Sequence, residues 1–144
     1  MSHSDEATTQ GSPLEPDQAA LFERALTAAQ AAYAPYSHFR VGAVVRAASG
    51  REYLGVNVEN AAYPAGLCAE RVALGAAATA GERQLTAVAV ASLDGEAAPC
   101  GACLQALSEI GDPLIVARAN GGRRVWRLRE LLPAPFPPPS ERAR

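Results

Sequence analysis

Apolar positions along this chain recur with two different periods, one typical of helices and one typical of strands. After Pro16-Asp17 the apolar residues recur every three or four positions, which predicts an amphipathic helix that Pro35 ends. One face of this helix would carry Leu21, Phe22, Ala25, Leu26, Ala29 and Tyr33. Further helices are predicted over residues 66–80, 101–110 and 129–132.

Short apolar runs between these helices predict the strands of a sheet. Residues 39–47 and 52–58 flank the turn signal Ser49-Gly50 and therefore predict a hairpin. Residues 85–93 are almost continuously apolar, which suits a strand covered on both faces. Two more strands are predicted over residues 114–118 and 123–128. The alternation of strands and helices in the middle favours an α/β layered domain around one sheet.

The composition indicates one globular domain with unstructured ends. The chain has 144 residues, of which 49% are hydrophobic and 19% charged. Residues 1–15, rich in Ser, Thr, Asp, Glu and Pro, are expected to form a disordered lead-in. The domain itself would span residues 16–136, and residues 137–144 would form a Pro-rich tail.

Charge and residue usage exclude several classes of protein. The net charge of −2 disfavours a protein that holds a nucleic-acid polymer. All 13 basic residues are arginine, so lysine Schiff-base chemistry is excluded. No run approaches the ~20 apolar residues of a membrane span, and the polar N-terminus is not a secretory signal. An odd number of cysteines, 3, fits the reducing cytoplasm better than a disulfide framework.

The cysteines and one glutamate form the pattern that points to chemistry. Cys68 and Glu70 lie in Cys-Ala-Glu, and Cys100 and Cys103 lie in Pro-Cys-Gly-Ala-Cys. Both strings are predicted at helix starts, where partial positive charge stabilises thiolates. Catalytic zinc typically takes three protein ligands and keeps a fourth position for water. The pattern therefore predicts one Zn²⁺ held by the thiolates, with Glu70 as the general acid–base beside the open position.

The same residues also fit structural, non-catalytic roles. Alone, the Cys100/Cys103 pair also fits a structural zinc half-site or a thiol redox pair. A structural site would need a fourth Cys or His, and His38 in a loop is a poor candidate. Glu70 also fits a carboxylate favoured by the helix dipole. Arg71 is interpreted as a donor to the thiolate sulfurs, with an ordinary exposed helix arginine as the alternative.

Several longer strings occur in order over residues 21–136. They are Tyr33-Ala34-Pro35-Tyr36-Ser37, Phe39-Arg40-Val41-Gly42-Ala43, Asn57-Val58-Glu59-Asn60-Ala61, Cys68-Ala69-Glu70-Arg71, Pro99-Cys100-Gly101-Ala102-Cys103 and Leu131-Leu132-Pro133. Together they resemble the small zinc-dependent cytidine deaminase family. The resemblance implies a three-layer α/β/α fold, with a mixed five-stranded sheet and helices on both faces.

The resemblance also implies a reaction. Cytidine and 2′-deoxycytidine would be hydrolysed to uridine and 2′-deoxyuridine with release of ammonia, a step of pyrimidine salvage. Zinc-bound hydroxide would attack C4 of the pyrimidine while Glu70 protonates N3 and then helps to expel ammonia.

Substrate contacts follow from the same resemblance. Asn57 and Glu59 would bind the ribose 3′-hydroxyl, although both also fit surface residues at a strand end. Phe39 would pack on the base, which is compatible with an inward-facing strand residue. The backbone N–H of Ala69 would meet the pyrimidine O2, and the Ala98 carbonyl would receive the departing amine.

Assembly and one departure from the family complete the expectations. The resemblance implies a homotetramer in which Tyr63 and Phe136 reach a neighbour's site, with Phe136 alternatively capping its own core. Leu104 stands where the family usually has arginine, so Arg71 alone would have to neutralise the site.

Three other functions remain open from the residues. One is deamination of a modified cytosine nucleoside such as blasticidin S. Another is a non-catalytic zinc or thiol module, which Glu70 argues against. The third is editing of polymeric RNA or DNA, which the acidic pI of about 5.7 disfavours.

Overall fold

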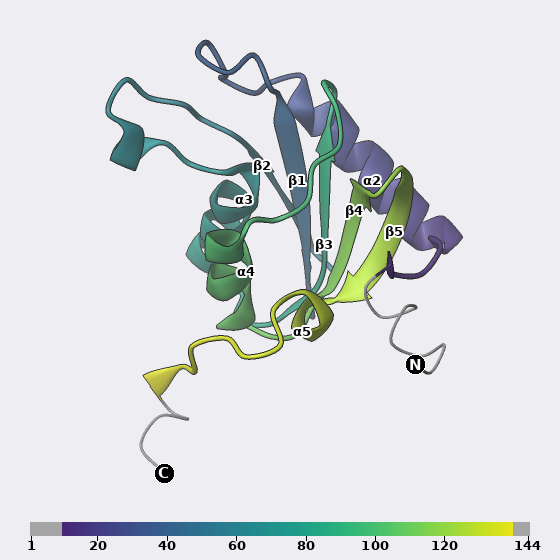
Figure 1. Ribbon diagram of the computed structural model, residues 1–144. Coiled ribbons are helices and arrows are strands. Elements are labelled where there is room, and N and C mark those ends of the chain that lie inside the picture. The colour runs from purple at the N-terminus through teal and green to yellow at the C-terminus, as the bar shows by residue number, and fades with distance from the viewer. Residues whose placement is uncertain (1–9, 140–144) are drawn as a thin grey trace.

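A mixed five-stranded sheet forms the centre of the fold, and the computed structural model describes it within residues 10–139. The strands lie in the order β2 (Glu52–Val56), β1 (Val41–Ala47), β3 (Leu85–Ser92), β4 (Leu114–Ala119) and β5 (Gly122–Arg127). Only β3 and β4 pair in parallel among these strands, and the other neighbours are antiparallel. The predicted hairpin of β1 and β2 is confirmed (Figure 1).

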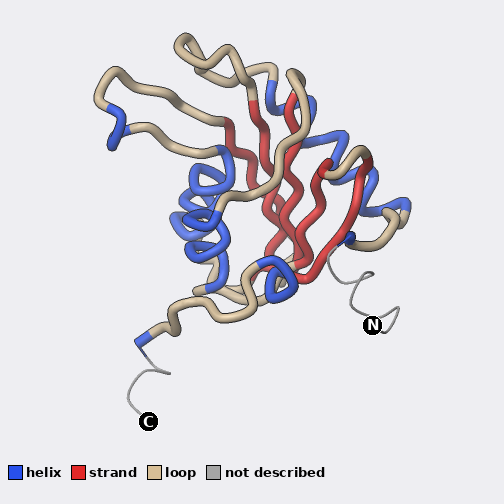
Figure 2. The backbone as a smooth tube through the Cα atoms, in the orientation of Figure 1, coloured by secondary structure: helices blue, strands red, loops and turns tan. Residues whose placement is uncertain are grey.

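Helices cover both faces of this sheet (Figure 2). Helix α2 (Pro16–Ala29) packs on one face, and α3 (Ala69–Thr79) and α4 (Gly101–Ser108) pack on the other. The short helices η1 (Tyr63–Ala65) and α5 (Leu128–Leu131) lie in the connections. This arrangement confirms the expected α/β/α layers with one mixed sheet.

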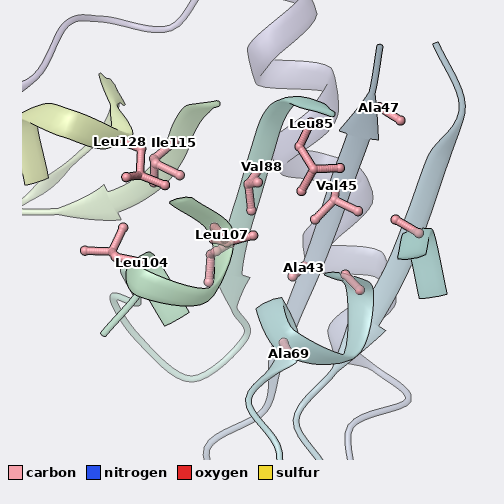
Figure 3. Close-up of a cluster of buried hydrophobic side chains, with 13 residues drawn as sticks. Ala43, Val45, Ala47, Ala69, Leu85, Val88, Leu104, Leu107, Ile115 and Leu128 are labelled. Atoms are coloured by element: carbon pink, nitrogen blue, oxygen red, sulfur yellow. The ribbon is translucent and has the colours of Figure 1, made fainter. Parts of the chain in front are cut away.

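Alternating side chains of the central strands supply two separate cores. Val88 and Val90 of β3 belong to the core beneath α3 and α4, together with Leu107 (Figure 3). Ala87, Ala89 and Ala91 of β3 instead pack against α2, next to Leu21 and Phe22. Because successive strand residues face opposite sides, the continuous apolar run gives a strand covered on both faces, as predicted.

The first helix is shorter than its apolar period predicted. It ends at Ala29, before Pro35, and Tyr33 lies outside it. The N–H of Tyr33 donates to the Asn57 carbonyl at 3.0 Å, and its own carbonyl accepts from the N–H of Glu59 at 2.9 Å. Placing Tyr33 on the helix was therefore wrong, because a bridge to the segment after β2 takes its backbone groups. The second strand likewise ends at Val56 rather than at residue 58.

The end of the expected disordered lead-in is ordered where it is described. Ser12 pairs with Val125 of the outermost strand through backbone hydrogen bonds of 2.9 and 2.8 Å. Gly11, at a φ of 71°, lies so close to Trp126 that a Cβ would come within 2.5 Å of the indole. Residues 10–15 thus differ from the prediction, because an edge strand offers unpaired backbone groups. Residues 1–9 and 140–144 lie outside the described part of the chain.

No helix within residues 10–139 combines the length and the apolar character needed to cross a bilayer.

Candidate active site

The starts of α3 and α4 bring the three thiols together. Cys68 is the N-cap of α3, Cys100 is the N-cap of α4, and Cys103 lies in the first turn of α4. The three sulfur atoms all lie within 4.8 Å of one another. Tetrahedral zinc with Zn–S bonds of about 2.3 Å would hold its sulfurs roughly 3.8 Å apart. The thiols are therefore already gathered at a spacing that suits one Zn²⁺.

A close approach of strand and helix places the first of these thiols. A Cβ on Gly55 of β2 would lie 2.2 Å from the Ala69 carbonyl oxygen and 2.4 Å from the Ala73 nitrogen. Only a residue without a side chain lets α3 pack so near the strand. Gly55 therefore helps to set the position of the helix start that carries Cys68 and Glu70.

The thiols differ in their electrostatic surroundings. Backbone N–H donation at the start of α4, chiefly from Cys103, lowers the pKa of Cys100. Cys103 is buried, and desolvation together with the Glu70 charge raises the pKa of its thiol. A divalent cation reverses this effect, because a coordinating thiol loses its proton to the metal. Three converging thiols, one of them buried beside a carboxyl, fit zinc as the resident ion.

Arg71 makes the contact that the sequence predicted. Its Nη2 donates to the Cys68 sulfur at 3.7 Å. The hydrogen bond to Cys68 is the largest cause that raises the pKa of Arg71, with a smaller contribution from Cys103. The guanidinium therefore faces the sulfur cluster as a donor.

Glu70 is one of the few buried charged side chains in the described chain. Only 5% of its surface is exposed. Burial raises its pKa, while hydrogen bonds and the Arg71 charge oppose the rise. A buried carboxyl with a raised pKa is suited to take up and deliver protons near neutral pH.

A cavity of about 490 Å³ opens above the thiols and Glu70. This volume falls in the usual range for small-molecule sites. The predicted site residues that line it are Phe39, Asn57, Glu59, Tyr63, Cys68, Ala69, Glu70, Ala98 and Cys100. Three predicted site residues do not line it: Cys103, which is buried, Arg71, and Phe136, which is 63% exposed.

Two polar residues of the cavity wall have backbone partners. Asn57 accepts from the N–H of Val41 at 2.9 Å and donates to the Phe39 carbonyl at 2.8 Å. Glu59 accepts from the backbone N–H groups of Tyr36 and Ser37 at 2.9 and 3.1 Å. It also accepts from the Ser37 hydroxyl at 2.5 Å, and these bonds lower its pKa. Both side chains are thus held in place at the rim of the cavity.

Comparison with known proteins decides the family. The model of the "cytidine and deoxycytidylate deaminase zinc-binding region" matches residues 15–119, which include all three cysteines and Glu70. The chain belongs to this deaminase family.

Relatives of this deaminase match it over most of their length. A cytidine deaminase of Halalkalibacterium halodurans is 37% identical over 83% of this chain and 94% of its own length. A cytidine deaminase of Sporosarcina psychrophila is 40% identical over 76% of this chain and 83% of its own. The crystal structure of cytidine deaminase from Burkholderia pseudomallei is 44% identical, with a TM-score of 0.75, and covers 82% of this chain and 98% of its own.

Leu104, where the deaminase family usually has arginine, is a core residue here. It is 6% exposed and belongs to the core with Leu107 and Leu128 (Figure 3). An apolar side chain at this position packs α4 onto the sheet and offers the sulfurs no charge. Arg71 does contact the cluster, since it donates to the Cys68 sulfur.

Other wall residues of this deaminase were missed by sequence reasoning. Val41, Leu67, Val90, Glu96 and Ala97 also line the cavity. In the sequence, the apolar residues among them cannot be told from ordinary core residues. Only the three-dimensional structure shows that they line the cavity. Glu96 carried no motif; its carboxylate accepts from the N–H of Gly121 in the β4–β5 turn at 2.7 Å.

Proposed function

We propose that this chain catalyses the zinc-dependent hydrolytic deamination of cytidine and 2′-deoxycytidine, with release of ammonia. The observation that carries the proposal is a cluster of three thiols with a buried carboxyl at the base of a nucleoside-sized cavity. The activity named for the bacterial relatives agrees with this chemistry.

The chemistry divides between the bound ion and Glu70. Cys68, Cys100 and Cys103 hold Zn²⁺, which when bound supplies an acidic water at its open position. Glu70 takes up a proton and delivers it to N3 of the pyrimidine as C4 is attacked. The same carboxyl then takes the proton of the new C4 hydroxyl and passes it to the amine, so the C4–N bond breaks, a C4 carbonyl forms and ammonia leaves. Such acid–base work typically contributes ~10²–10⁴-fold to the rate.

The cavity wall would orient the nucleoside. The Phe39 ring would pack on the base, the Ala69 N–H would donate to O2, and the Ala98 carbonyl would accept from the amine. Asn57 and Glu59 would bind the ribose 3′-hydroxyl. These assignments are supported by the position of all five residues around one cavity.

The charge of the cavity favours a nucleoside over a nucleotide. Its charged lining residues are Glu59, Glu70 and Glu96, and within the described chain no arginine or histidine lines it. A 5′-phosphate would meet the carboxyl groups of the wall and no arginine or histidine side chain. An uncharged nucleoside is therefore the better substrate class, and polymeric nucleic acid is disfavoured on the same ground.

We further propose a homotetramer in the cytoplasm, with sites shared between subunits. Tyr63 is 85% exposed and Phe136 63% exposed, so both residues lie at the surface of the single chain, where a neighbouring chain would meet them. Gln105 pairs with the Phe136 backbone, donating to its carbonyl at 2.9 Å and accepting from its N–H at 2.8 Å. This pairing would fix the segment that presents the ring. The three free thiols suit a reducing compartment.

Ammonia release from zinc-loaded protein tests the proposal. We expect turnover of cytidine and 2′-deoxycytidine, and far less of deoxycytidylate and blasticidin S. A clear preference for blasticidin S would move the assignment to a modified nucleoside. No release from any of the four, at one zinc per chain, would favour a non-catalytic zinc module. Binding to single-stranded RNA or DNA at moderate salt would point to an editor of polymers.

A further inference from the structure

Arg40 joins two segments that are far apart in the sequence. Its backbone N–H donates to Asp94 Oδ2 at 2.8 Å, and its side-chain Nε donates to the same oxygen at 3.0 Å. Its Nη2 donates to Asp94 Oδ1 at 2.9 Å. The guanidinium and carboxylate thus form a two-pronged pair, the most directional of the common ion pairs.

The same two segments are also tied through their backbones. The Arg40 carbonyl accepts from the Ser92 hydroxyl at 2.8 Å and from the Leu93 N–H at 3.2 Å. The Ser92 hydroxyl in turn accepts from the N–H of Asp94 at 3.0 Å. The backbone N–H and carbonyl of Arg40 therefore both bond to the last residue of β3 and the two residues that follow it.

Each side of this junction leads to one wall of the substrate cavity. Arg40 directly follows Phe39, which lines the cavity. Asp94 opens the loop that runs to Ala98 and to Cys100, which line the cavity from the other segment. The walls also touch, since a Cβ on Gly95 would lie 3.3 Å from Cε2 of Phe39.

We propose that Arg40 and Asp94 form a clasp that sets the spacing between the Phe39 wall and the 96–100 wall of the cavity. The two are positioning residues that act through Phe39 and the loop. The kinetic consequence of the clasp rests on the proposed deaminase function, whereas its effect on the loop does not.

The clasp acts locally. The side chains of Arg40 and Asp94 are 46% and 26% exposed, and exposed ion pairs contribute little to global stability. The Arg40 hydrogen bonds lower the pKa of Asp94 to about 2, so the carboxylate is charged at any ordinary assay pH. Breaking the pair should therefore loosen the loop and leave the fold intact.

Single and double alanine variants test the clasp by kinetics. We expect Arg40→Ala and Asp94→Ala each to lower kcat/KM for cytidine about tenfold, mainly through KM, since Phe39 would contact the bound base before and during reaction. The double variant should be no worse than Asp94→Ala, because the aspartate variant already removes both side-chain bonds and the bond from the Arg40 backbone N–H. Glu23→Ala is the matched control, since it breaks the exposed pair of Arg123 and Glu23 between α2 and β5.

Amide hydrogen exchange gives a readout that needs no turnover. Residues 93–98 should exchange faster in Arg40→Ala and Asp94→Ala than in the wild type, and at the wild-type rate in Glu23→Ala. Unchanged exchange would overturn the clasp, whether or not the protein deaminates cytidine. Faster exchange with unchanged kcat/KM in an active enzyme would overturn its role in positioning substrate. A wild type inactive on cytidine but loosened by these variants would refute the proposed function and keep the clasp.

Discussion

At the residue scale, we propose that Arg71 offsets the negative charge of the zinc-bound sulfur cluster. Zn²⁺ with three thiolates would carry a net charge of −1, which would weaken the metal as a Lewis acid. The guanidinium of Arg71 contacts the Cys68 sulfur, and Leu104 contributes no second cation. Under this proposal the acidity of the zinc-bound water would depend on this one arginine.

Replacing this arginine should weaken the metal site. We expect Arg71→Gln to lower zinc affinity or activity about 10–100-fold, the usual cost of losing a hydrogen bond to a metal ligand. Zinc loss to a competing chelator, followed over time, measures the effect. Arg51→Gln, in the exposed β1–β2 turn, is the control. Equal zinc retention and activity in wild type and Arg71→Gln would contradict this role.

Most residues of the candidate site were predictable from the sequence because they lie in short motifs. Cys68, Glu70, Cys100 and Cys103 are recognisable from spacings of two or three residues. Glu96 was not, because it joins the cavity through a hydrogen bond to Gly121 on a distant turn. The sequence also did not reveal that Asn57 bridges the backbone of residues 39 and 41.

Between elements, the packing of α3 on β2 controls the geometry of the thiols. The contact depends on Gly55, which has no room for a side chain beneath Ala69 and Ala73. Because Cys68 caps this helix, a shift of α3 moves one ligand relative to the two on α4.

Gly55→Ala should therefore impair both stability and zinc binding. Overpacking of this kind typically costs ~1–3 kcal/mol. We expect a lower melting temperature and less zinc per chain than in Gly122→Ala, where an added Cβ meets nothing closer than 3.8 Å. Thermal melts and metal analysis of the two variants make the comparison. Equal values for both would show that α3 adjusts without cost.

Stability at acid pH should report the junction after β3. The pKa of Asp94 is lowered from 3.8 to about 2 by Arg40, so its contribution is complete above the unfolded-state pKa and is lost as pH falls toward 2. Asp94→Asn should lower the melting temperature at pH 7 by a small amount that shrinks between pH 4 and pH 2. Melts of both proteins across this range check the sign. A difference that grows on acidification would be inconsistent with the lowered pKa.

Helices and strands were predictable where the apolar pattern was long, but the residues at which they begin and end were not. The nearly continuous run of β3 was identified within one residue of its end at Ser92. Tyr33 fitted the helical period yet lies outside α2, and residues 66–68 precede α3, with Leu67 bridged to Val58. In both places a pairing with a distant segment determines the backbone, and local periodicity carries no information about it.

At the scale of the whole molecule, Tyr63 of η1 lines the substrate cavity and is 85% exposed within the single chain. The backbone of Phe136, near the C-terminal end of the described chain, pairs with Gln105 of α4. Under the proposed assembly, one subunit supplies Glu70 and another supplies Phe136 to each complete site.

Hybrids of two impaired variants test shared sites. Glu70→Gln should be inactive, and Phe136→Ala should bind cytidine more weakly, since its ring would be missing from the neighbour's site. Mixed assemblies would contain sites with Glu70 from one variant and Phe136 from the other. We expect such mixtures to turn over cytidine at low concentration faster than the mean of the separate variants. Activity equal to that mean, in mixed assemblies confirmed by mass, would exclude sharing through Phe136.

The proposed chemistry is tested most directly at Glu70. Wild type and Glu70→Gln, each loaded to one zinc per chain, would be compared for ammonia release from cytidine. The glutamine keeps the size of the side chain but cannot carry a proton. We predict equal zinc content and a fall in kcat of at least ~10²-fold. A zinc-loaded glutamine variant with wild-type turnover would contradict the acid–base role of Glu70.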